Sequence, residues 1–156
     1  MSDKELAGQE LVGKVAIVTG AGRNIGRAIA RQLAAAGAAV VVNAKSNQKE
    51  ADAVVREIEA AGGKAIVYLA DVADAAAVEA MAQAALKAFG RIDILINNAS
   101  LRREKPIGEM SYANWREVMN ATLDSAFHGV HACLPAMKKA GGGSIVNIGG
   151  MSAHIG

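Results

Sequence analysis

The stretch VAIVTGAGRNIGRA, residues 15–28, decides the fold of this chain. Its apolar first half is typical of a buried strand, and it passes through glycines directly into a helical pattern. We expect Gly20 to end the strand, Gly22 to keep the turn small and Gly26 to let the helix pack against the sheet. Ile25 is expected to point into the core. Because the first turn of such a helix offers free N–H groups and a positive dipole end, the stretch predicts a turn that binds a pyrophosphate.

The rest of the chain repeats the same alternation of apolar runs and alanine-rich helical patterns. Five runs read as strands that are covered on both faces: Val15–Thr19, Ala39–Asn43, Ala65–Leu69, Ile92–Asn97 and Ser144–Ile148. Between them, apolar residues recur every three or four positions, as they do along one face of a helix. The pattern predicts an α/β fold, a Rossmann-like doubly wound parallel sheet with helices on both faces. We expect the fold to be truncated after the fifth strand.

Glycines and one aspartate mark the ends of the expected helices. Gly37, Gly62, Gly90 and Gly141 each follow a helical pattern, where a left-handed residue closes the last turn. Asp74 precedes the pattern of residues 75–89 and can cap it. The helix ends therefore agree with the apolar periodicity.

The composition fits one globular domain. The chain has 156 residues, of which 52% are hydrophobic and 21% charged, and a formal charge of +2. That charge predicts no nucleic-acid partner, and the short apolar runs predict no membrane span. We expect residues 1–10 to be a polar tail and residues 11–156 to be the domain. Because the tail lacks the apolar centre of a signal peptide, we expect a cytoplasmic protein. Cys133 has no second cysteine to pair with and is expected to be a buried small hydrophobe.

Several motifs in order resemble the short-chain dehydrogenase/reductase family. TGAGRNIG at 19–26 resembles its glycine turn, ADV at 70–72 its adenine contact, INNAS at 96–100 the segment after its fourth strand, and GSIVNIGG at 143–150 its fifth strand. The resemblance implies hydride transfer between a nicotinamide cofactor and a small-molecule carbonyl or alcohol substrate. It also implies a homodimer or homotetramer through the apolar stripes of one long helix, residues 115–137, although packing within one chain explains such stripes as well.

We expect a set of cofactor-binding residues at these motifs and directly after the second strand. They are Gly20, Gly22, Arg23, Asn24, Ile25, Gly26, Lys45, Ser46, Asp71, Val72, Asn98, Ala99 and Ser100. Asn24 stands where the family has a glycine, and asparagine is the other residue that best tolerates a positive φ. Ser100 likewise replaces the last glycine of its motif. We expect the turn to keep its binding function.

The end of the second strand favours NADP(H) over NAD(H). Proteins that choose NAD usually place an acidic residue there, and this chain has none before Glu50. Lys45, Ser46 and Arg23 instead supply positive charge and donors for a 2′-phosphate. If both cations are only solvated surface residues, an NAD-linked protein remains the alternative.

The catalytic motifs of the family are altered or missing. Thr122 stands where the family has a helix-borne asparagine, and Gly150 where it has a serine, so Ser152 is the candidate catalytic residue. His154 is a second candidate acid or a surface residue. The tyrosine and lysine pair that would donate a proton is not in the chain. A catalytically degenerate dinucleotide-binding protein, such as a sensor or a partner subunit, is therefore the alternative function.

Two other clusters carry weaker hypotheses. His128 and His131 are three residues apart but lack a third ligand, so no metal site is expected. Arg102, Arg103 and Lys105 lie near the expected mouth of the site, where they favour an anionic substrate or simply form a charged surface.

Overall fold

A computed structural model describes residues 9–150 of the protein, so Ser152 and His154 lie outside the described residues. Five strands form one sheet: β1 (Val15–Val18), β2 (Ala39–Ala44), β3 (Lys64–Leu69), β4 (Ile94–Asn97) and β5 (Ser144–Asn147). The helices are α2 (Asn24–Ala35), α3 (Gln48–Ala60), α4 (Ala75–Phe89), α5 (Tyr112–Met119) and α6 (Ser125–Lys139), with a short 3₁₀ helix at Ile107–Glu109 and a π-helical turn, η2, at Asn120–Asp124.

The sheet is parallel, and its strand order confirms the predicted fold. The order is β3-β2-β1-β4-β5, so the direction of winding reverses between β1 and β4. In folds of this kind, ligands bind where the loops that follow neighbouring strands diverge at such a reversal. The turn after β1 and the loop after β4 lie on either side of this point, and we call the region between them the crevice.

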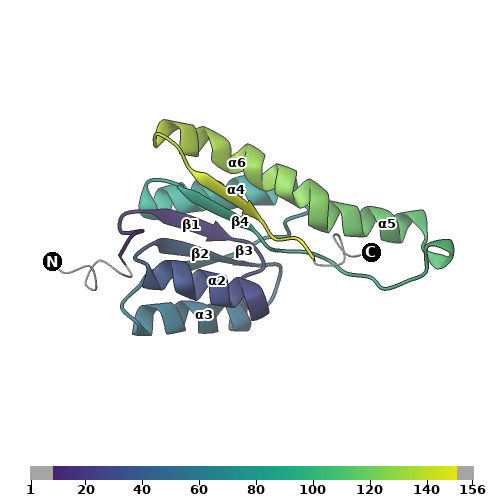
Figure 1. Ribbon diagram of the computed structural model, residues 1–156, viewed down its shortest axis with the longest axis horizontal. Coiled ribbons are helices and arrows are strands. Elements are labelled where there is room, and N and C mark those ends of the chain that lie inside the picture. Colours follow the sequence, from purple (N-terminus) through teal and green to yellow (C-terminus); the bar gives the residue numbers. More distant parts are fainter. Residues whose placement is uncertain (1–8, 151–156) are drawn as a thin grey trace.

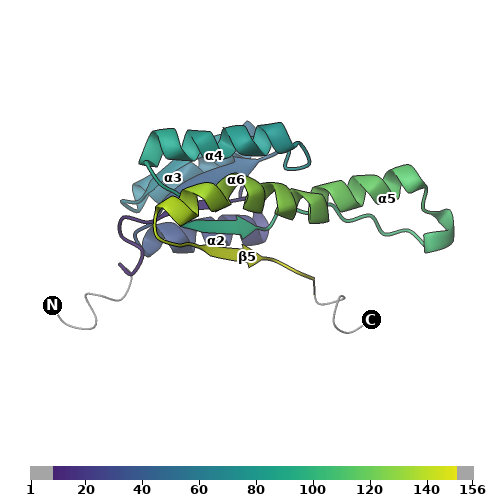
Figure 2. The same cartoon turned by 90° about the horizontal axis from the view of Figure 1, so that it is seen from above.

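Helices cover both faces of the sheet, in three layers (Figures 1 and 2). One face packs on α2 and α3 through a buried cluster that includes Val18, Val40 and Val54. The other face packs on α4 and α6 through a second cluster that includes Ile17, Leu95 and Met81. Because β1 and β2 are buried on both sides, their side chains are apolar without alternation, as the sequence predicts, with Asn43 of β2 as the exception.

The predicted helix ends are confirmed. Gly37, Gly62, Gly90 and Gly141 have φ values of +98°, +84°, +80° and +89°. The carboxylate of Asp74 accepts hydrogen bonds from the first N–H groups of α4. Positive φ at each of these glycines ends the helix at the amino edge of the sheet, where the next strand begins.

One core prediction is wrong. Ile25 does not point into the core, because the residue is 61% exposed. It lies in the first turn of α2, whose buried residues are Gly26, Ala30 and Ala34. The helix therefore meets the sheet along a line of small residues, and Ile25 stays at the outer side of the glycine turn.

The predicted long helix is present but contains a π-helical turn. α5, η2 and α6 follow one another without a break, and α5 extends past the carboxyl edge of the sheet (Figure 2). Its apolar residues do not all belong to the core: Cys133 and Met137 are buried, whereas large side chains along the rest of the stripe are exposed. The exposed ones are Tyr112, Trp115, Leu123, Phe127 and Leu134. In the part of the chain from 9 to 150, no helix is long and apolar enough to span a membrane.

A buried carboxylate closes the amino edge of the sheet. The carboxylate of Asp93 accepts hydrogen bonds from the backbone N–H of Val15 at 3.0 Å and from the side chains of Lys14 and Arg91. Burial alone would raise the pKa of Asp93, but the bonds from Arg91, Val15 and Lys14 hold this pKa below its usual value. This edge of the sheet is therefore fixed by polar contacts within the protein.

Candidate functional site

The glycine turn after β1 has the close packing that its sequence implies. Gly20 has a φ of +62° and Asn24 a φ of +49°, so asparagine does adopt the positive φ expected of it. A Cβ on Gly26 would lie 2.3 Å from the carbonyl oxygen of Gly20 and 2.6 Å from Nδ2 of Asn98. Gly26 is thus required where the helix meets the turn and the loop after β4, rather than where it meets the sheet. A Cβ on Gly22 would make only ordinary contacts.

The amino end of α2 is open to an anion. Arg23 precedes the helix, its side chain makes no capping bond, and the first turn carries no acidic residue. In contrast, Asn47, Asp74 and Ser111 each cap the helix that follows them. The free N–H groups and dipole of α2 are therefore available to a negatively charged ligand at the carboxyl edge of the sheet.

A buried asparagine fixes the positions of three loops beneath this turn. Asn43 is the last residue but one of β2 and is 1% exposed. Its Oδ1 accepts a hydrogen bond from the N–H of Gly20, and its Nδ2 donates to the carbonyl oxygens of Tyr68 and Ala70 at 3.2 and 3.1 Å. The loops after β1, β2 and β3 are thus joined through one amide side chain.

Thr19 and Asn98 fix the other side of the crevice. The hydroxyl of Thr19 accepts hydrogen bonds from the N–H groups of Asn98 and Ala99 and donates to the carbonyl of Ile96. Nδ2 of Asn98 donates to the carbonyl oxygens of Thr19 and Gly20. The loop after β4 is therefore attached to the glycine turn across the reversal point.

The residues proposed to meet a 2′-phosphate differ in their contacts. Nζ of Lys45 donates to Oδ2 of Asp71 at 2.7 Å, and this ion pair joins the ends of β2 and β3. A hydrogen bond from Lys45 lowers the pKa of Asp71, and the same bond raises the pKa of Lys45. Arg23 and Ser46 are exposed, and no ion pair is recorded for Arg23 among residues 9–150.

The remaining predicted cofactor residues line the same edge. Val72 is 8% exposed, and its carbonyl oxygen lies 3.2 Å from Nδ1 of His128 on α6. The N–H of Ala99 donates to the hydroxyl of Thr19, and Ser100 is exposed. The structure therefore brings the glycine turn, the loop after β3 and the loop after β4 to one edge of the sheet.

Thr122 contacts the segment that follows β4. Thr122 lies in the π-helical turn, and its hydroxyl lies 3.4 Å from the backbone N–H of Leu101, from which it accepts a weak hydrogen bond. Across the turn, Arg116 donates to Asn120 and Asp124. Thr122 thus connects the helix to the segment that follows Ser100.

The cationic segment near the mouth is largely neutralised. Arg102 pairs with Glu104, and Arg103 pairs with Glu117 on α5. These ion pairs are exposed, and they attach the segment to itself and to the helix. Because the charges of Arg102 and Arg103 are paired, they give less support to the prediction of an anionic substrate.

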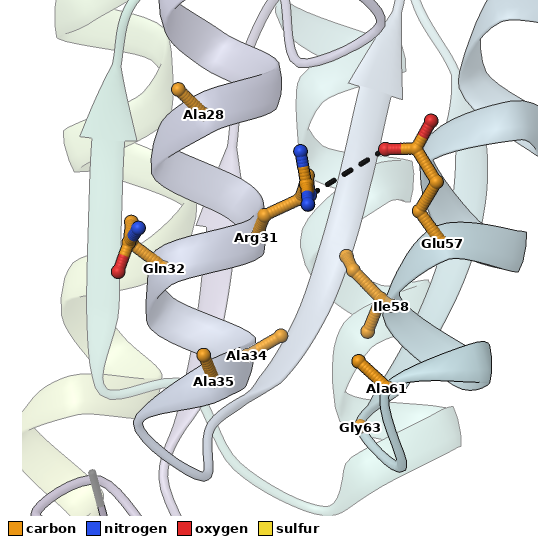
Figure 3. A pocket seen from close by; sticks show the side chains of 9 residues that line it. All are labelled: Ala28, Arg31, Gln32, Ala34, Ala35, Glu57, Ile58, Ala61 and Gly63. Atoms are coloured by element: carbon orange, nitrogen blue, oxygen red, sulfur yellow. Dashed lines mark ion pairs between the residues drawn. The ribbon is translucent and has the colours of Figure 1, made fainter.

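A groove of about 240 Å³ between α2 and α3 lies at the opposite edge (Figure 3). Its lining comes mainly from the carboxyl-terminal halves of the two helices, which return toward the amino edge of the sheet. Arg31 faces Glu57 across it at 3.5 Å. None of the predicted site residues lines this groove, and it is separate from the crevice.

Sequence reasoning missed the two residues that organise the crevice, Thr19 and Asn43. The available signal was a polar side chain at the end of an otherwise apolar buried strand, because such a side chain needs partners in the adjoining loops. Within residues 9–150, no three His, Cys, Asp or Glu side chains gather as a metal site would require.

Comparisons with known proteins agree with this geometry. A family model described as short chain dehydrogenase matches residues 14–156. An uncharacterized oxidoreductase of Methylorubrum extorquens is 44% identical over 94% of this chain and 58% of its own length. A 3-oxoacyl-[acyl-carrier-protein] reductase of Staphylococcus aureus is 38% identical over 92% of this chain and 58% of its own.

A solved structure, a metagenomic short-chain oxidoreductase in complex with NADP, is 41% identical, with a TM-score of 0.83 over 88% of this chain and 62% of that one. The chain thus spans about three fifths of the length of these relatives. Because the family model covers nearly all of the sequence and the glycine turn, sheet order and crevice agree with it, the chain belongs to the short-chain dehydrogenase family.

Proposed function

We propose that this chain is the dinucleotide-binding part of an NADP(H)-dependent oxidoreductase of the short-chain type. The observation that carries the proposal is the open amino end of α2 at the reversal point of the sheet, with Arg23 beside it. When bound, the nicotinamide would exchange a hydride with a carbonyl or alcohol carbon of a small-molecule substrate.

The residues of the crevice fit such a cofactor. The first turn of α2 would receive the pyrophosphate, because its N–H groups have no side-chain acceptor. Gly20 and Gly26 have no side chain, so the turn can pack closely against the loop after β4. Thr19 and Asn98 hold that loop, which would lie beside the nicotinamide ribose. All of these contacts are made within the protein, and they hold the glycine turn and the loop after β4 in place.

The preference for NADP(H) rests on charge. β2 ends without a carboxylate, and Lys45 and Arg23 follow β2 and β1, which are neighbours in the sheet. Cations in these places would attract the 2′-phosphate that distinguishes NADP(H). One similar solved protein was crystallised with NADP, which supports the same choice.

We also propose a cytoplasmic homodimer or homotetramer. The exposed apolar side chains along α5 and α6, among them Trp115 and Phe127, suit a helix surface that meets a second copy. The single buried thiol, Cys133, suits a reducing compartment.

Calorimetric titration with NADPH and NADH tests the proposal. We expect NADPH to bind more tightly, and Arg23→Ala to weaken NADPH binding by about tenfold with a smaller effect on NADH, since a charged hydrogen bond is lost. Arg31→Ala is the matched control, because it removes the same charge from the far end of α2. Folded protein that binds neither dinucleotide would refute the proposal.

A second candidate is a dinucleotide-binding protein without turnover. Thr122 favours it, because its hydroxyl contacts the N–H of Leu101 where the family would hold a relay water. This candidate predicts that a longer chain containing these residues binds NADPH but transfers no hydride to any carbonyl substrate. Oxidation of NADPH by such a chain, followed by its absorbance, would exclude it.

A further inference from the structure

Lys45 differs from the other cation of the crevice because the protein already supplies it with a counter-ion. Its ammonium lies 2.7 Å from Oδ2 of Asp71, across the adjacent ends of β2 and β3. No such partner is recorded for Arg23 among residues 9–150. A 2′-phosphate that approaches Lys45 therefore meets an ammonium that is already shared.

The two members of this pair are held very differently. Asp71 is fixed, because its Oδ1 accepts a hydrogen bond from the N–H of Ala73 at 3.0 Å while Oδ2 faces Lys45. The Lys45 side chain is 74% exposed and has no other recorded partner in the described part of the chain. The carboxylate is thus the rigid member, and the ammonium is the member that can move toward a ligand.

We propose that Asp71 sets the preference between NADPH and NADH by competing with the 2′-phosphate for Lys45. This inference rests on the proposed function. It adds Asp71 as a residue that limits the selectivity for NADPH over NADH. NADH has no group that draws Lys45 away, so its binding leaves the pair intact. NADPH gains Lys45 only to the extent that the phosphate outcompetes the carboxylate.

The family resemblance gives Asp71 a contact with adenine, and the test must separate the two roles. Adenine is common to both dinucleotides, so a change in that contact alters both affinities alike and cancels in their ratio. The measured quantity is therefore the ratio of the dissociation constants for NADH and NADPH. Asp71→Asn removes the charge but keeps an oxygen for the N–H of Ala73, so the turn is preserved.

The experiment is a double-mutant cycle by calorimetry with wild type, Asp71→Asn, Lys45→Met and the double variant. We expect Asp71→Asn to raise the ratio by about two- to fivefold, as suits the release of an exposed ion pair. Lys45→Met should lower it, and Asp71→Asn should then have no effect. Glu59→Gln is the control, since it makes the same charge change on the exposed side of α3.

Each result decides between distinct explanations. A ratio that is unchanged or lower in Asp71→Asn overturns the inference, because Asp71 then has no influence or orients Lys45 for the phosphate. A rise that persists with Lys45→Met also overturns it, since repulsion by the carboxylate alone explains that result. Wild type that binds neither dinucleotide overturns the proposed function and the inference with it, whereas wild-type binding with an unaltered ratio overturns the inference alone.

Discussion

Replacing Asn43 by alanine should destabilise the whole carboxyl edge of the sheet. The side chain is 1% exposed, and it serves the N–H of Gly20 and the carbonyl oxygens of Tyr68 and Ala70 at 3.1 to 3.2 Å. A buried polar group that loses its partner costs about 1–3 kcal/mol. Within residues 9–150 the N–H of Gly20 has no other acceptor, and the amide group of Asn43 donates to both carbonyls, so we expect a loss of about 2–4 kcal/mol.

Urea unfolding followed by circular dichroism measures this loss. Asn47→Ala is the matched control, because Asn47 is an exposed cap of α3 whose removal costs about 1 kcal/mol. NADPH affinity should fall in Asn43→Ala as well, since Gly20 belongs to the glycine turn, and should not change in the control. An Asn43→Ala variant that is as stable as Asn47→Ala would refute the role of Asn43 in joining the three loops.

Three further predictions concern other sites. Gly26→Ala should abolish NADPH binding and destabilise the protein, since its Cβ would lie 2.3 Å from the carbonyl oxygen of Gly20; normal affinity by calorimetry would contradict this. The pKa of Asp93 is lower in the folded protein than its unfolded value of 3.8. The ionised carboxylate and its bonds to Arg91 therefore stabilise the fold above pH 3.8, and this stabilisation is lost as the pH falls through the lower pKa of the folded protein. The free energy of unfolding should therefore fall more steeply with decreasing pH in wild type than in Asp93→Asn, and equal slopes would contradict this role of Asp93. Burial, with a smaller contribution from Glu79, raises the pKa of Cys133 to about 12, so the thiol should resist iodoacetamide at pH 8 until urea unfolds the chain.

The sheet and its helices were predictable because their signals are local. Short uniform apolar runs such as VAIV at 15–18 are typical of strands covered on both faces, and glycines such as Gly90 are typical of helix ends, where a positive φ is required. The observed strands begin and end within two residues of the predicted positions. The positive φ of Asn24 was predictable for the same reason, since few residues tolerate that conformation.

The arrangement of side chains around the crevice was less predictable, because it depends on contacts between distant residues. Ile25 fits the apolar spacing of α2, yet its position in the first turn leaves it exposed beyond the core. Lys45 and Asp71 are 26 positions apart, and only the pairing of β2 with β3 brings them together. The π-helical turn that contains Thr122 has no clear signal in an otherwise regular apolar pattern.

The most direct test of the central claim is to find where NADPH binds. In a titration followed by backbone amide resonances, the largest shifts should fall on the glycine turn and the first turn of α2, including Asn24 and Gly26. Smaller shifts are expected at Asp71 and Asn98. Shifts confined to the groove around Arg31 and Glu57, or no shifts in the folded protein, would contradict dinucleotide binding at the carboxyl edge.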